Sequence, residues 1–272
     1  MDHEALIFLH IPKAAGTTLN RIIEWQYSPL SIFTIDPHRI RATPERFKTL
    51  SEQRRRQLRV VRGHMFYGIH EFLPQGATYI TMLRDPVARL LSAYSFILRR
   101  PLNPMHRKLK RGRVGVEAFI RLTPNRQNLQ CRMLAGVEDV TCDQRVLDIA
   151  KENITKSFSV VGLCERFEES LLLIAKTFDW EIPYYENRKV SKVRPALEPN
   201  VVSMIQEYNR FDMELYEFAR KHFEDTLRKE EDVMRQALAA LDSIPKPGPV
   251  KRFCYSTVVA SRFLVSKIMS AL

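Results

Sequence analysis

Residues 5–23 read ALIFLHIPKAAGTTLNRII. The apolar run that opens this stretch is long enough for one buried strand, and Pro12 ends the strand. A loop of small residues follows, after which Leu19, Ile22 and Ile23 share one face of a predicted helix. A strand, a short loop and a helix N-terminus make an anion cradle, because outward-pointing backbone N–H groups and the positive end of the helix dipole meet there.

The residues of this loop suit an anion. Gly16 lets the backbone approach the anion closely, and Lys13 adds a mobile positive charge. Thr17 or Thr18 can cap the helix and donate a hydroxyl group. A nucleoside-triphosphate loop has the order GxxxxGK[ST], whereas Lys13 precedes Gly16 and GK[ST] occurs nowhere in the chain. An ordinary ATP or GTP site is therefore disfavoured, and a strand–turn–helix corner without a ligand is the alternative.

A second junction of strand and helix follows further along the chain. Residues 77–83 are rich in strand formers and lead into Arg84, the start of an Arg-Asp-Pro helix opening. Ser92 lies eight residues after Arg84, about two helical turns further on. Where such a helix N-terminus faces a ligand, the Arg84 guanidinium and the Ser92 hydroxyl can reach one phosphate. The alternative is a plain helix cap, with Asp85 near the dipole and Arg89 in solvent.

These two segments carry a family resemblance. Residues 12–19, Pro-Lys-x-x-Gly-Thr-Thr-Leu, resemble the 5′-phosphosulfate-binding loop of sulfotransferases, which use 3′-phosphoadenosine 5′-phosphosulfate (PAPS). Residues 84–94 resemble the 3′-phosphate-binding motif of those enzymes, RDPxxRxxSxY. The resemblance covers roughly residues 5–223 and is to the sulfotransferase family 2 type. It implies a P-loop-like, three-layer α/β fold with a central parallel sheet flanked by helices.

His64 is the predicted general base. It follows a predicted strand and lies in the sequence between the two nucleotide motifs, and the carboxyl ends of parallel strands are where ligands gather. A lone His is more often structural. However, residues 63–67, Gly-His-Met-Phe-Tyr, resemble the catalytic-His segment of the uronyl 2-O-sulfotransferase-like branch, where the His is the general base. We expect His10, in the strand before the loop, to pack or to orient the loop.

The resemblance implies transfer of a sulfuryl group from PAPS to a hydroxyl group, with a carbohydrate as the expected acceptor. 3′-Phosphoadenosine 5′-phosphate (PAP) is the implied product, and no metal is required. His64 would take the proton of the attacking hydroxyl, and Lys13 would neutralise charge on the bridging oxygen. The implied nucleotide-binding residues are Lys13, Ala14, Ala15, Gly16, Thr17, Thr18, Leu19, Arg84 and Ser92, with Ser191 and Arg194 from a region that closes over the nucleotide in the family. The seven His residues show no metal-ligand spacing.

The acceptor side is less defined. Residues 95–113 are strongly basic, and we expect a loop or mobile lid because Pro101 and Pro104 break a helix. The stretch is either a solvated loop or an electropositive rim facing the acceptor. The candidate acceptor-contacting residues are Arg62, Arg99 and Arg100, and Asn128, Gln130 and Arg132 could also face the acceptor.

Composition bounds the class of protein. A 272-residue chain with 45% hydrophobic residues can bury a sizeable core, and the formal net charge of +12 indicates a polyanionic ligand or partner. We expect residues 1–243 to form the sulfotransferase domain, 244–250 a Pro-rich linker and 251–272 a basic amphipathic tail that contacts a membrane peripherally, docks on a partner or folds back. The four cysteines form no CxxC, so free thiols in a reducing compartment are expected.

Neither a signal peptide nor an N-terminal anchor is expected, because Asp2 and Glu4 precede the first strand. Many family members enter the secretory pathway through such an anchor. Because none is expected here, a cytoplasmic enzyme is the simpler hypothesis. The expected partner is a hydroxyl-bearing acceptor, a glycan or glycolipid, with no specific nucleic acid. Two alternatives stay open: a nucleotide-dependent kinase on the same fold, and a non-catalytic basic module that binds membranes or polyanions.

Overall fold

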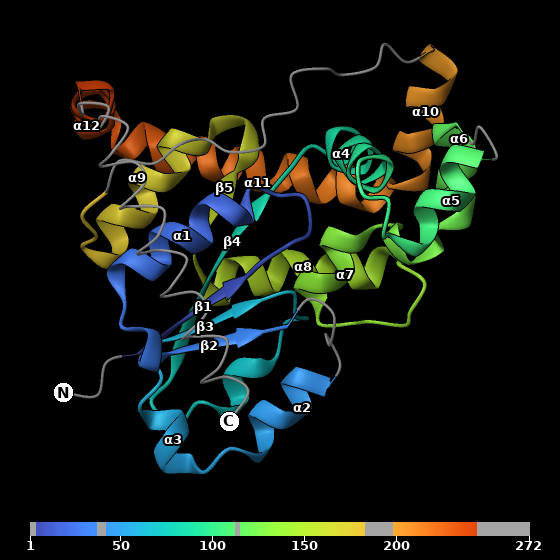
Figure 1. Cartoon of the computed structure of the whole chain (residues 1–272). Helices are drawn as coiled ribbons and strands as arrows, with labels where there is room; N and C mark the ends of the chain where they lie inside the picture. Colours follow the sequence, from blue (N-terminus) through green and yellow to red (C-terminus); the bar gives the residue numbers. More distant parts are fainter. Residues whose placement is uncertain (1–3, 37–41, 112–114, 183–197, 244–272) are drawn as a thin grey trace, which may run out of the picture.

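The computed structural model describes residues 4–36, 42–111, 115–182 and 198–243 (Figure 1). In this part of the chain, five strands form one parallel sheet in the order β2-β3-β1-β4-β5. The strands are β1 Ala5–Leu9, β2 Ile32–Ile35, β3 Val60–Gly63, β4 Ala77–Leu83 and β5 Phe158–Leu163. The predicted α/β fold with a central parallel sheet is confirmed.

Helices cover the sheet and complete the three layers. Their bounds are α1 Gly16–Gln26, α2 Ala42–Thr49, α3 Glu52–Arg56, α4 Pro86–Leu98, α5 Pro104–Arg111, α6 Val116–Leu122, α7 Leu129–Ala135, α8 Gln144–Ser157, α9 Phe167–Phe178, α10 Pro199–Tyr208, α11 Arg210–Lys229 and α12 Glu231–Ser243. Every residue of β1 is buried, since a parallel strand at the centre of a sheet is covered on both faces. Helices α8, α9 and α11 all contact β5, and α11 also packs on α7.

A second, smaller hydrophobic cluster joins α4, α5, α6 and α10. It contains Leu90 and Ile97 of α4, Leu109 of α5, Phe119 of α6 and Ile205 of α10, all buried. This helical lobe lies beside the sheet in Figure 1 and includes the helix that follows Arg84. The lobe therefore fixes one wall of the region where the nucleotide motifs were predicted.

The expected loop or lid at residues 95–113 was wrong in part, because α4 continues to Leu98 and residues 104–111 form α5. Pro104 is tolerated at the first helical position, where its missing N–H would have no helical partner. The Asn103 side chain accepts a hydrogen bond from the Met105 N–H (2.9 Å), and His106 and Leu109 are buried. Burial of one face thus stabilises a short helix despite its charge.

Two helix boundaries are set by local backbone chemistry. Residues 42–56 form two helices, α2 and α3, since Ser51 caps α3 by accepting from the Arg54 N–H (3.2 Å). Helix α7 begins at Leu129, because Asn128 has a left-handed backbone with φ of 45°. Apolar periodicity does not report either boundary.

No helix in the described ranges is both long enough and apolar enough to span a membrane. The predicted linker 244–250 and tail 251–272 lie outside the described residues, as do Ser191, Arg194 and Cys254. The domain boundaries and the cytoplasmic location therefore stay predictions. Cys131, Cys142 and Cys164 carry free thiols.

Candidate active site

The carboxyl ends of β1, β3 and β4 meet at one edge of the sheet. Leu9 is the register partner of Gly63 on one side and of Thr81 on the other. The residues that follow these strands, among them His10, His64 and Arg84, therefore lie close to the same edge. This is the place in an open parallel sheet where ligands bind.

The loop between β1 and α1 has an unusual backbone. Lys13 and Ala15 both have positive φ, 73° and 52°, a conformation that costs free energy for residues other than Gly. Helix α1 begins at Gly16 with Ala15 as its N-cap, and there is no side-chain cap hydrogen bond. The prediction that Thr17 or Thr18 caps the helix was wrong, because both lie inside its first turn. An anion bound at this helix start would accept hydrogen bonds from backbone N–H groups in the position that a cap side chain takes in other helices.

Gly16 is needed here because His10 packs directly on it. A Cβ added at Gly16 would lie 1.9 Å from the His10 Nε2 atom. The His10 ring in turn stacks on Phe8 at 5.3 Å and tilts against His64 at 4.3 Å between ring centroids. His10 thus packs beneath the loop, as expected from its position in the sequence.

The backbone carbonyl of His10 fixes the tautomer of His64. The His64 Nδ1 atom lies 2.6 Å from the His10 carbonyl oxygen, which can only accept a hydrogen bond. Nδ1 therefore carries the proton, and Nε2 keeps its lone pair for a substrate proton. Burial lowers the pKa of His64, the hydrogen bond to the His10 carbonyl raises it, and the positive charge of Lys13 lowers it, with a net lowering. The neutral, basic form is thereby favoured.

Lys13 lies over an aromatic ring that the sequence analysis did not single out. Its Nζ atom is 4.1 Å from the centroid of the Phe96 ring, and the Arg100 guanidinium is 4.8 Å from the same centroid. Phe96 follows Ser92 by four residues in α4, so both side chains lie on one face of that helix. The spacing from Ser92 was the available signal for Phe96.

Arg84 connects the two predicted phosphate motifs. Its guanidinium Nη1 donates to the Lys13 carbonyl at 3.1 Å, across 71 residues of sequence. Its backbone N–H donates to the Gln130 Oε1 atom (3.0 Å), and its carbonyl accepts from the Gln130 Nε2 atom (2.9 Å). Asp85 caps α4 by accepting from the Ala88 N–H at 2.8 Å. The cap alternative is therefore right for Asp85, whereas Arg89 is fully buried rather than in solvent.

Arg62 is not placed to contact an acceptor. It is 1% exposed, and its guanidinium pairs with Glu24 at 2.6 Å and donates to the Asn20 carbonyl at 2.8 Å. This buried pair ties β3 to α1. Arg99 and Arg100, in contrast, are exposed at the end of α4.

The suggestion that residues 128–132 face the acceptor was also wrong for its three named side chains. Asn128, Gln130 and Arg132 are 3%, 0% and 7% exposed. Asn128 accepts from the backbone at the start of α11, and Arg132 donates to the Gln127 carbonyl at 3.2 Å. Their hydrogen bonds hold the fold around Arg84 rather than a ligand.

The described residues contain no group of three or more His, Cys, Asp or Glu side chains that could hold a metal ion. The cations gathered near the loop are protein side chains, Lys13, Arg84 and Arg100. The arrangement suits binding of a multiply charged anion beside a neutral imidazole.

Comparison with known proteins identifies the region that carries this site. The model of the sulfotransferase family matches residues 1–219. Heparan-sulfate 6-O-sulfotransferase 2 of Danio rerio is 29% identical over 177 residues, which are 53% of this chain and 38% of the relative. The corresponding protein of Gallus gallus is 30% identical over 179 residues, 53% of this chain and 44% of the relative.

Human heparan-sulfate 6-O-sulfotransferase 1 is 24% identical over 195 residues, 60% of this chain and 47% of the relative. The chain thus spans less than half the length of each of these curated relatives. Their names specify 6-O sulfation, so they do not single out the 2-O branch that residues 63–67 resemble.

Proposed function

The chain belongs to the sulfotransferase family, and from this premise we propose that it transfers a sulfuryl group from PAPS to a hydroxyl group of a carbohydrate acceptor. The bond between sulfur and the nucleotide's phosphate oxygen breaks as the acceptor oxygen bonds to sulfur. PAP leaves, and the hydroxyl proton passes to the protein. The positioning and charge stabilisation required are those of phosphoryl transfer.

The observation that carries the proposal is the contact of Arg84 with the Lys13 carbonyl. This contact joins residues 12–19 and residues 84–94, for which we propose the 5′-phosphosulfate and 3′-phosphate roles, near the N-termini of α1 and α4. A 5′-phosphate would accept from the backbone N–H groups of residues 15–19, and a 3′-phosphate from Arg84 and Ser92. Lys13 would stabilise the charge on the departing oxygen.

We assign the general base to His64. Its Nδ1 atom is held by the His10 carbonyl, its Nε2 atom is the proton acceptor, and its lowered pKa keeps it neutral at physiological pH. The nearby Lys13 contributes to this lowering. The same lysine thereby serves both the departing oxygen and the protonation state of the base.

For the acceptor we propose a glycan that meets the protein at the exposed end of α4, near Arg99 and Arg100. The relatives named for heparan sulfate support a carbohydrate, and the formal net charge of +12 supports an acidic one. Arg62 is left out of this proposal because its guanidinium is buried against Glu24.

The first experiment is calorimetric binding of PAP, AMP and ATP to the wild type, Arg84→Ala and the control Arg228→Ala. Arg228 is exposed near the far end of α11 and pairs only locally with Asp225 at 3.2 Å. We expect PAP to bind most tightly, this preference to be lost in Arg84→Ala, and Arg228→Ala to behave as the wild type. Equal binding of the three nucleotides by the wild type would contradict a sulfotransferase.

The second experiment measures sulfated product from PAPS and heparan-type chains with wild type and His64→Ala. General-base catalysis contributes about 10²–10⁴-fold, so kcat should fall by that order while PAP affinity is kept. A kinase would instead turn over ATP. A basic binding module would bind polyanions in a salt-sensitive manner that survives loss of Lys13 and Arg84.

A further inference from the structure

The backbone of Arg84 is held by one buried side chain from another element. The Gln130 amide accepts from the Arg84 N–H at 3.0 Å and donates to the Arg84 carbonyl at 2.9 Å. Gln130 is 0% exposed, so water does not compete for these bonds. The guanidinium of Arg84 can therefore swing only about its own side-chain torsions.

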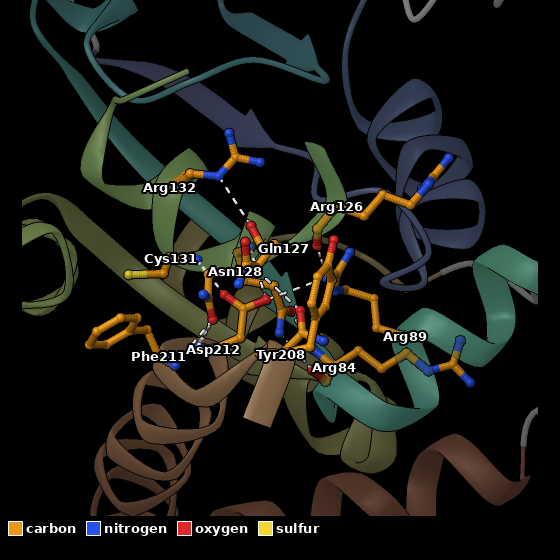
Figure 2. Close-up of polar contacts among 12 residues, drawn as sticks. Arg84, Arg89, Arg126, Gln127, Asn128, Cys131, Arg132, Tyr208, Phe211 and Asp212 are labelled. Carbon is orange, nitrogen blue, oxygen red and sulfur yellow. Dashed lines mark hydrogen bonds and ion pairs between the residues drawn. The ribbon is translucent and has the colours of Figure 1, made fainter. Parts of the chain in front are cut away.

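Gln130 is in turn held from α11. Its backbone N–H donates to the Asp212 Oδ2 atom (3.2 Å), and the next N–H, of Cys131, donates to Oδ1 (2.8 Å). Asp212 is 0% exposed and also pairs with Arg89 at 3.4 Å. Figure 2 shows the Asp212 carboxylate between the start of α7 at Cys131 and the Arg89 side chain.

The bonds between α7 and α11 are reciprocal. Asp212 from α11 accepts from the first turn of α7, while the Asn128 side chain, just before α7, accepts from the N–H groups of Phe211 and Asp212 at 3.1 Å each. The Asn209 side chain accepts from the Asn128 N–H at 3.2 Å. The backbone N–H groups at the start of each helix thus donate to a side chain at the start of the other helix. These bonds fix the relative position of α7 and α11.

A second connection reaches the neighbouring residue. The Asp85 N–H donates to the Glu165 Oε1 atom at 3.2 Å, and the Tyr216 hydroxyl of α11 donates to Glu165 Oε2 at 2.8 Å. Helix α11 therefore supports both peptide groups that flank the Arg84 Cα atom through α7 and Gln130, and the second of them also through Glu165. Two supports at adjacent residues define both the place and the direction of the Arg84 side chain.

We propose that Gln130 and Tyr216 are positioning residues that aim Arg84 at the 3′-phosphate. The inference rests on the proposed function, since it assigns Arg84 to that phosphate. Neither residue touches the nucleotide; each acts through the peptide groups of residues 84 and 85. Their contribution is the selectivity for a nucleotide that carries a 3′-phosphate.

The test is the ratio of the dissociation constants for AMP and PAP, measured for the folded protein. Gln130→Met keeps the length of the side chain and removes both hydrogen bonds to Arg84. We expect the ratio to fall by about tenfold or more, since a hydrogen bond to a charged group such as the one from Arg84 to a phosphate is worth about 10–100-fold in affinity.

Gln75→Met is the matched control. Gln75 also bridges backbone groups, donating to the carbonyls of Arg55 and Leu58 at 3.0 and 2.9 Å, but at the amino end of β3. Its ratio should equal that of the wild type even if its melting temperature falls. Tyr216→Phe removes only the hydroxyl that holds Glu165, and should lower the ratio by a smaller factor than Gln130→Met.

Unchanged ratios in Gln130→Met and Tyr216→Phe would overturn the inference, and Tyr216→Phe, which removes a single hydroxyl from a part-buried residue, gives a result even where Gln130→Met does not fold. A wild type that binds PAP no better than AMP would overturn the proposed function and this inference with it. A normal wild-type ratio with unchanged variants would leave the proposed function intact and remove the positioning role alone.

Discussion

Helices α1 and α7 both begin after a residue with a left-handed backbone, Ala15 and Asn128, but their first turns are treated differently. At α7 the buried carboxylate of Asp212 accepts from two N–H groups. At α1 the cap residue is an alanine, there is no side-chain cap hydrogen bond, and Gly16 and His10 pack closely. Within the described residues, a carboxylate of the protein accepts from the start of α7, and no side chain caps the start of α1.

The difference separates a structural helix start, at α7, from the one where we propose that a ligand binds, at α1. A helix N-terminus attracts negative charge in either case. Where the charge comes from Asp212, the bond contributes to folding and holds two helices together. Where it comes from a ligand, the same physics contributes to affinity.

Replacing Asp212 by Ala should have the largest effect, on stability. The change leaves the fully buried Arg89 without its carboxylate and two N–H groups without an acceptor. Breaking a buried pair in this way costs about 3–5 kcal/mol of unfolding free energy. Urea denaturation should show this loss for Asp212→Ala and a change within about 0.5 kcal/mol for the exposed Asp225→Ala on the same helix. Equal losses of unfolding free energy in Asp212→Ala and Asp225→Ala would contradict the structural role of Asp212 at the start of α7.

Replacing Gly16 by Ala should act on binding instead. The new Cβ would meet the His10 ring at 1.9 Å and displace either the ring or the loop. We expect PAP affinity to fall by about 10–100-fold, because a hydrogen bond that the displaced loop no longer makes to a charged phosphate is worth about 1.5–3 kcal/mol. Gly115→Ala, at the start of α6 with nothing within 4 Å of the added Cβ, is the control and should bind PAP normally. Normal PAP binding by Gly16→Ala would show that the close packing beneath α1 is dispensable.

The third prediction concerns the positive charge of Lys13, in the loop before α1, and its effect on the pKa of His64. As the proposed general base, His64 would act in its neutral form, so turnover should fall as the pH drops through a pKa that lies below the ordinary value of 6.5. Lys13→Met removes a positive charge that lowers this pKa, so the pKa of His64 should rise and the acid limb should move to higher pH. NMR titration measures this directly, and His70, whose lowered pKa comes from burial, should titrate as before. An unchanged pKa of His64 in Lys13→Met would contradict the electrostatic effect of Lys13 on the base.

The smallest effect should come from the exposed end of α4. Arg99→Ala and Arg100→Ala each remove one solvent-exposed charge, which is worth about 0.2–1 kcal/mol in a contact. We expect the KM for an acidic glycan to rise by about two- to fivefold, with the KM for PAPS unchanged. The increase should shrink at high salt, because exposed charges are screened. A rise in the KM for PAPS would indicate that these arginines contact the nucleotide and not the acceptor.

Much of the sheet follows from the sequence. The apolar run before Pro12 and the strand formers at 77–83 and 158–163 correspond to β1, β4 and β5, because buried parallel strands read as continuous apolar segments. The convergence of His64 and Arg84 was also predictable, since carboxyl ends of parallel strands share an edge. The strand order was not, because it depends on pairings between residues far apart in the chain.

The errors share a physical cause. Arg62 was predicted to contact the acceptor, but it pairs with Glu24 on another element. The sequence does not reveal this pairing. The roles of Gln130 and Asp212 were missed for the same reason, since the two residues are 82 positions apart in the sequence. The cap assigned to Thr17 or Thr18 failed on a left-handed backbone at Ala15, a conformation uncommon for Ala.

The reciprocal bonds of Asn128 and Asp212 also set the order of events during synthesis. The nucleotide loop, His64, Arg84 and Gln130 are all made before α11, and Asp212 follows Gln130 by 82 residues. At about 5–20 residues per second, the ribosome takes about 4–16 s to cover that distance. A nascent chain in this interval has both phosphate motifs without the support that aims Arg84. Selective nucleotide binding should therefore begin only after α11 has emerged, so the ligand would act on a nearly finished domain and not as a template for its folding.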